Sequence, residues 1–157
     1  MNDNRAVNLE LSRLADVVGL HEPASEPLRL AFGLACAARV QHLLENPKAA
    51  DCLAVLRAFV EEKADRPALD AAVRDVAALA NAHRGSDSID GSAHAAVSAT
   101  YAVANALAGR ALDAASYAAY ATVYAYGGYA VNDPAAFETE FAWQVETFKR
   151  LSSTRRV

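Results

Sequence analysis

The chain has 157 residues, of which 54% are hydrophobic, with a mean hydropathy of +0.04 and a formal net charge of −4. This length fits one domain that can bury its own core. The acidic balance argues against nucleic-acid binding, which needs concentrated Lys and Arg, and no uncharged apolar run reaches the roughly 18 residues of a membrane span.

The N-terminal segment lacks the basic start, apolar stretch and cleavage site of a secretory signal peptide, so we expect a cytoplasmic protein. Cys36 and Cys52 lie in apolar helical runs without CxxC spacing. Reduced, buried thiols are therefore expected, and neither a metal site nor a cofactor is predicted. The basic segment 151–157 is predicted to be a frayed, solvated tail.

Helical periodicity with regular stop signals predicts an all-α fold, a single-domain bundle or array of about seven helices over residues 1–157. The first four predicted helices lie at about 5–18, 25–45, 48–64 and 65–83. After the polar loop 85–91 come two Ala-rich helices, separated near Gly109 and ended by Gly127 and Gly128. A closing helix at about 133–150 carries an apolar face formed by Phe137, Phe141, Val145 and Phe148.

The second predicted helix is apolar on several faces, which indicates a central position. Arg39 therefore lies among apolar neighbours, and we expect it to be largely buried. A buried guanidinium requires a carboxylate or carbonyl partner. Asp51 or an acid of the closing helix is the expected partner, in a structural ion pair.

The Ala-rich helices predict a hairpin with closely approaching backbones, because alanine is a strong helix former with a very small side chain. Three tyrosines share one face of the second helix at i, i+3 and i+7, which indicates a structural role in packing. They are Tyr117, Tyr120 and Tyr124. Alanines 114, 118, 121 and 125 form another face, which should abut the preceding helix.

The first Ala-rich helix carries a polar stripe at i, i+4, i+7 and i+11, formed by His94, Ser98, Tyr101 and Asn105. Catalysis is not predicted, because no oxyanion-hole loop and no acid that would orient the histidine can be identified. A solvated or partner-binding face is the favoured interpretation. The candidate partner-binding residues are His94, Ser98 and Asn105, with Asp87 and Asp90 in the preceding loop.

Four segments match a family pattern: Leu30-Ala-Phe-Gly-Leu-Ala-Cys-Ala-Ala-Arg39-Val-Gln-His-Leu-Leu, then 53–59, 92–99 and 118–121. Over residues 28–130 the chain resembles the immunity proteins of bacterial polymorphic-toxin systems, in the immunity-five-like group. This resemblance implies an all-helical protein that binds a cognate toxin and neutralises it by stoichiometric occlusion, without catalysis. An acidic surface would then favour a basic toxin such as a nuclease.

Two other classes of function remain open at this point. One is a helical small-ligand-binding protein or enzyme with a pocket near His83 and His94, which flank the loop 85–91. The other is a homo-oligomeric helical scaffold that associates through the Ala and Tyr face of the hairpin.

Overall fold

The computed structural model describes residues 6–82 and 92–154, and within these ranges it contains seven α-helices, four short 3-10 helices and no strand. The predicted all-α architecture is confirmed. The α-helices are α1 (Leu9–Val18), α2 (Glu26–Arg39), α3 (Pro47–Val60), α4 (Arg66–Ala82), α5 (Ser92–Leu107), α6 (Ala111–Tyr126) and α7 (Glu138–Thr154). The 3-10 helices are η1 (Pro23–Ser25), η2 (Gln41–Leu43), η3 (Gly128–Asn132) and η4 (Pro134–Phe137).

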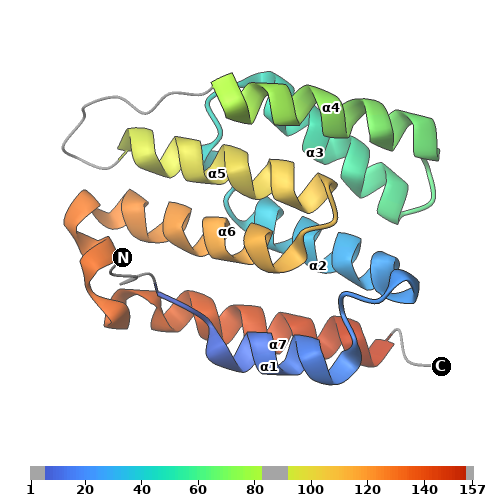
Figure 1. Cartoon of the computed structure of the whole chain (residues 1–157). Coiled ribbons are helices and arrows are strands. Elements are labelled where there is room, and N and C mark those ends of the chain that lie inside the picture. Colours follow the sequence, from blue (N-terminus) through green and yellow to red (C-terminus); the bar gives the residue numbers. More distant parts are fainter. Residues whose placement is uncertain (1–5, 83–91, 155–157) are drawn as a thin grey trace.

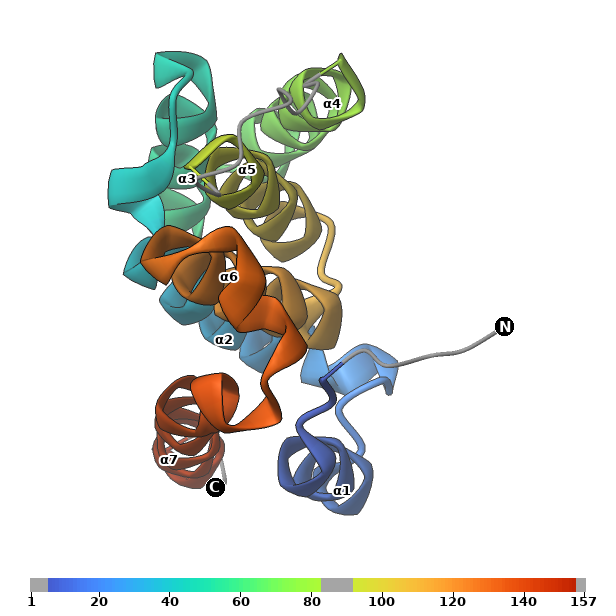
Figure 2. The ribbon, with the colours of Figure 1, turned by 90° about the vertical axis from the view of Figure 1, so that its left-hand side faces the viewer.

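The helices lie roughly side by side, with α3 and α4 at one edge, α5, α6 and α2 in the middle, and α1 with α7 at the other edge (Figure 1). The view along the helices shows α1 and α7 as a separate pair beside α2 and α6 (Figure 2). α2 contacts α3, α5, α6 and α7, and its side chains Phe32 and Cys36 are fully buried. The predicted central position of this helix is confirmed.

Local capping fixes several helix ends where the sequence predicts them. The Asn46 side chain accepts a hydrogen bond from the Lys48 amide at 2.9 Å, and Asp65 accepts one from the Ala68 amide at 3.0 Å. Each therefore satisfies an amide that a first helical turn leaves without a partner. Gly19 ends α1 with φ 68°, in the left-handed region that favours glycine.

Several helix boundaries differ from the prediction. α1 begins at Leu9 rather than near residue 5, and α3 ends at Val60 rather than near residue 64. α7 continues to Thr154, so residues 151–154, predicted as part of a frayed tail, are helical, because Leu151 packs against the core.

The end of α2 and the start of α7 differ most. α2 ends at Arg39 rather than near residue 45, because the Val40 amide bonds to the Ala37 carbonyl in a tighter turn that leads into η2. This turn places Val40 fully inside the core. At the closing helix, Asp133 caps the 3-10 helix η4, and α7 itself begins only at Glu138.

α2 and α5 approach each other closely at Gly33. A Cβ atom on Gly33 would lie 3.1 Å from the Cα atom of Ala106 on α5. This separation is tighter than nine in ten contacts of real Cβ atoms, so a side chain here would require the backbone of α5 to shift by a few tenths of an ångström. The close approach of the two helices therefore depends on the missing side chain of Gly33.

The closing helix covers the core as predicted. Phe148 is buried and packs edge-on against Phe32 of α2, with ring centroids 5.1 Å apart. Phe137, just before α7, and Val145 are also buried, whereas Phe141 is half-buried. Gln144, on the same helix, donates a 2.8 Å hydrogen bond to the Ala115 carbonyl and thereby fastens α7 to α6.

Arg39 has a carboxylate partner on α7, as predicted, but it is less buried than expected. Its Nε and Nη2 atoms donate to the two carboxylate oxygens of Glu140 at 2.7 and 2.8 Å, and the guanidinium lies 4.4 Å from the centre of the Trp143 ring. The Arg39 side chain is nevertheless 35% exposed. As the last residue of α2, it lies where this helix leaves the core, so its outer side faces solvent.

The two cysteines have free thiols and are buried, as predicted. Burial raises the pKa of the Cys36 thiol strongly and that of Cys52 to a smaller extent, because a thiolate is poorly solvated there. No helix in the described ranges combines the length and apolarity that crossing a bilayer requires.

Candidate functional site

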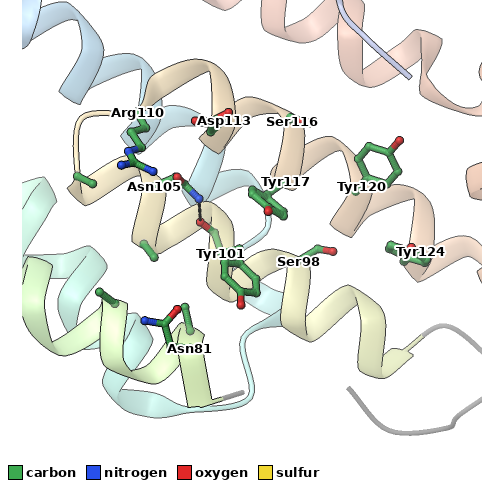
Figure 3. A pocket seen from close by; sticks show the side chains of 14 residues that line it. Asn81, Ser98, Tyr101, Asn105, Arg110, Asp113, Ser116, Tyr117, Tyr120 and Tyr124 are labelled. Carbon is green, nitrogen blue, oxygen red and sulfur yellow. Dashed lines mark hydrogen bonds between the residues drawn. The ribbon is translucent and has the colours of Figure 1, made fainter. Parts of the chain in front are cut away.

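A groove of about 650 Å³ runs along α5 and is bounded by α4 and α6 (Figure 3). Small side chains of α4 and α5, mostly alanine, form much of its lining, and the larger side chains come mainly from α6. The labelled residues that line it are Asn81, Ser98, Tyr101, Asn105, Arg110, Asp113, Ser116, Tyr117, Tyr120 and Tyr124.

The groove forms because α5 and α6 divide their residues between two faces. Alanines point into the contact between the helices, where Ala114, Ala118 and Ala121 are buried, and this contact is the most extensive between any two helices. Tyr117 and Tyr124 lie toward the outer side, exposed and half-buried respectively. The small residues therefore let the two backbones approach, and the tyrosines are left to line the surface.

Aromatic rings from the two helices contact each other along the groove. Tyr101 of α5 stacks on Tyr117 of α6, with ring centroids 5.2 Å apart and planes inclined by 22°. His94 of α5 stacks on Tyr124 of α6 at the same separation, with planes inclined by 29°. Both geometries are typical of favourable aromatic pairs.

Tyr120 makes two contacts within the chain, one through its hydroxyl group and one through its ring. Its hydroxyl oxygen accepts a hydrogen bond from the Ala6 amide at 3.0 Å, and its ring packs edge-on against Phe137 at a centroid separation of 4.9 Å. This tyrosine therefore ties the segment before α1 and the segment before α7 to the groove wall. The predicted structural role of Tyr120 agrees with these contacts.

The other end of the groove is polar and lies at the turn between α5 and α6. The Asn105 side-chain amide donates a 2.8 Å hydrogen bond to the Tyr101 carbonyl, as the dashed line in Figure 3 shows. Arg110 precedes the first turn of α6 and is exposed, as is Asp113 one turn later. Within the described ranges, the Arg110 guanidinium makes no ion pair and no hydrogen bond.

The structure brings together some of the predicted partner-binding residues. Ser98 and Asn105 both line the groove, although Ser98 is only 8% exposed and offers little surface to a partner. His94 is exposed and lies beside the groove, behind Tyr124, rather than in its lining. Asp87, Asp90 and His83 lie outside the described residues, as do Arg155 and Arg156 of the predicted tail.

One alanine of α6 does not follow the prediction. Ala125 is exposed, whereas Ala114, Ala118 and Ala121 are buried as expected. α5 begins at Ser92, so the last turn of α6 lies beside the end of α5. Ala125 in that turn therefore has less of α5 to pack against.

The contribution of α6 to the groove has a signal in the sequence. In an antiparallel hairpin, residues equally distant from the turn lie opposite each other. Tyr101 and Tyr117 each stand eight positions from Gly109, and His94 and Tyr124 each stand fifteen. The polar stripe of α5 therefore faces an equally spaced stripe on α6, whereas Asn81 on α4 has no such local signal.

The groove combines aromatic, polar and charged side chains. Among the described residues, no group of three His, Cys, Asp or Glu side chains is placed to hold a metal ion. Among the residues that the structure describes, no histidine or carboxylate forms a hydrogen bond with Ser98, and Tyr101 and Tyr117 line the same groove (Figure 3). Its lining offers phenol rings, hydroxyl groups, two side-chain amides, one guanidinium and one carboxylate, which suit molecular recognition.

Comparison of the chain with protein-family models, with curated proteins and with solved structures finds no match.

Proposed function

We propose that this protein is an immunity protein, which binds a cognate bacterial toxin and blocks it by stoichiometric occlusion, without a chemical step. The resemblance over residues 28–130 suggests the class, and the observation that carries the proposal is the tyrosine-lined groove along α4, α5 and α6. We also place this activity in the cytoplasm, where free thiols such as Cys36 and Cys52 persist.

The groove has the composition of a protein-binding surface. Tyrosine is enriched at the centres of protein interfaces and among residues whose truncation costs most binding energy. The rings here already contact one another or the core, so they lose little conformational freedom on binding. Exposed residues such as Tyr117 and Arg110 leave the groove accessible to a protein segment.

Co-expression with the toxin encoded beside this protein tests the proposal. The wild-type protein should protect cells and form a one-to-one complex with the toxin. Tyr117→Ala should weaken the complex by about 2 kcal/mol, or roughly thirtyfold, if this ring lies at the centre of the interface. Tyr126→Ala is the matched control, because Tyr126 ends the same helix, is 75% exposed and lies outside the groove.

One result would contradict the immunity function, and another would contradict the choice of the groove as the binding surface. If the toxin kills cells equally with and without this protein, the immunity function is wrong. If Tyr117→Ala and Tyr126→Ala protect equally well and both fold, the toxin contacts another surface.

A small-ligand-binding protein or enzyme is the second candidate, because the groove volume lies within the range of ligand pockets, roughly 300–1,000 Å³. If it is an enzyme, the protein should show turnover of a small substrate that His94→Ala abolishes. An oligomeric scaffold has less surface available than the sequence suggests, because most of the alanine face of α6 is already buried within the chain.

A further inference from the structure

The two ends of the groove differ in chemistry. Figure 3 shows Tyr120 and Tyr124 at one end, Asn105, Arg110 and Asp113 at the other, and the stacked rings of Tyr101 and Tyr117 between them. The eight residues of α5 from Ser98 to Asn105 span roughly 10 Å at the rise of an α-helix. A short segment of a partner can therefore contact both ends at once.

The lining of the groove carries no net charge. Among the described residues that form it, Arg110 is the one cation and Asp113 the one carboxylate. The chain as a whole has a formal charge of −4, so the groove differs from the average surface. With one charge of each sign, this lining gives a partner segment of positive or negative net charge no overall attraction, while a charged side chain that enters the groove loses hydration.

Among the described residues, the polar end presents acceptors and donors without a partner: the Asn105 side-chain oxygen, the Asp113 carboxylate and the Arg110 guanidinium. The amide nitrogen of Asn105 is used by the Tyr101 carbonyl, while its side-chain oxygen makes no hydrogen bond within the described ranges. The Arg110 guanidinium is equally without a partner there. An oxygen acceptor beside an N–H donor matches the two polar groups of peptide units, N–H and C=O.

The tyrosines of the aromatic end also contact rings outside the groove lining. His94 stacks on Tyr124, and Phe137 packs against Tyr120. Tyr120 and Tyr124 still line the groove, so a ligand in the groove can contact them. An aromatic side chain gains from such surfaces beyond its buried area, because rings prefer offset or edge-on contacts.

Resting on the proposed function, we propose that the groove binds an uncharged segment of the toxin, with an aromatic side chain against Tyr120 and Tyr124 and a peptide unit at Asn105 and Arg110. Recognition then depends on ring contacts and peptide hydrogen bonds, not on attraction between a basic toxin and an acidic surface. Complex stability should accordingly change little with ionic strength.

Titration of the isolated protein with blocked tripeptides, followed by NMR chemical shifts, tests this chemistry without the toxin. The uncharged peptide N-acetyl-Phe-Gly-Gly-amide, which spans about 10 Å when extended, should shift the groove amides of α5 and α6 with a millimolar dissociation constant, equally at low and high salt. The same peptide with Lys or Glu in place of Phe, which carries a positive or a negative charge, should bind more weakly. Asn105→Ala and Arg110→Met should each weaken binding about fivefold, and Tyr126→Ala should leave it unchanged.

Arg110 is exposed, so Arg110→Met keeps the test decisive if Asn105→Ala does not fold. The proposal is overturned if a charged probe binds as tightly as the aromatic one, if the shifts lie outside the groove, or if millimolar probe causes no shift. It is also overturned if sedimentation shows a dimer that covers the groove. If the probes cause no shift but co-expression still protects cells, only the proposed chemistry of the bound segment is rejected. If the probes bind but the protein does not protect cells, only the proposed toxin partner is rejected.

Discussion

Arg39 shows how one side chain joins two helices that are far apart in the sequence. It ends α2, and its guanidinium binds both carboxylate oxygens of Glu140 on α7. The hydrogen bond to Glu140 raises the pKa of Arg39 further above its ordinary value, so the cation persists at all practical pH values. Glu140 is the less exposed partner, with 8% of its side chain accessible.

We expect Arg39→Met to destabilise the fold by about 1–3 kcal/mol, because it leaves the Glu140 carboxylate buried without its cation. The cost should fall below that of a fully buried pair, because the exposed side of Arg39 gives water access. Urea unfolding measures the change. The double variant Arg39→Met, Glu140→Gln should recover part of the loss, and additive effects of the two changes would contradict the pairing.

At the scale of elements, the hairpin of α5 and α6 determines where the groove lies. Alanines set the separation of the two helices, and residues equally distant from Gly109 meet across it. Gly109 itself has φ 78°, which permits the tight reversal between the helices. α2 then packs behind this hairpin through the close contact of Gly33 with Ala106.

The two ends of the alanine face of α6 should respond differently to a larger side chain. Ala118→Leu should destabilise the protein by about 1–3 kcal/mol, because Ala118 is 3% exposed and surrounded by packed side chains. Ala125→Leu is the control on the same helix, and it should leave the melting temperature nearly unchanged, because Ala125 is exposed. Equal melting temperatures for both variants would show that Ala118 is not packed against α5 and α2.

At the scale of the whole molecule, α2, α5 and α6 hold the two edges together. One cluster of buried side chains includes residues of α1 and α7, and another includes residues of α3 and α4. Both clusters contain residues of α2, α5 and α6. Neither edge has an apolar core of its own, so the protein should fold as one cooperative unit.

Chemical unfolding should therefore give one transition by two independent probes. Trp143 is the only tryptophan of the chain and lies on α7, so its fluorescence reports on the edge formed by α1 and α7. Far-UV circular dichroism reports on all helices. The two curves should coincide, and a fluorescence change at lower urea concentration would mean that this edge unfolds separately.

The sequence by itself determined the helical class, most helix ends and the division of α6 into an alanine face and a tyrosine face. These features depend on residues a few positions apart, as in the caps at Asn46 and Asp65. The end of α2 before Val40 was not predicted, because no local capping residue marks it. The turn there depends on the burial of Val40 in the core.

Only the tertiary structure decided which acid binds Arg39, how far Arg39 is exposed, and that α4 completes the groove with Asn81. Arg39 and Glu140 are 101 residues apart, and several carboxylates satisfy the same chemical requirement. The packing of α2 against α7 selects one of them. Contacts within a helix or a hairpin follow from spacing along the chain, whereas contacts between distant helices depend on how their surfaces fit.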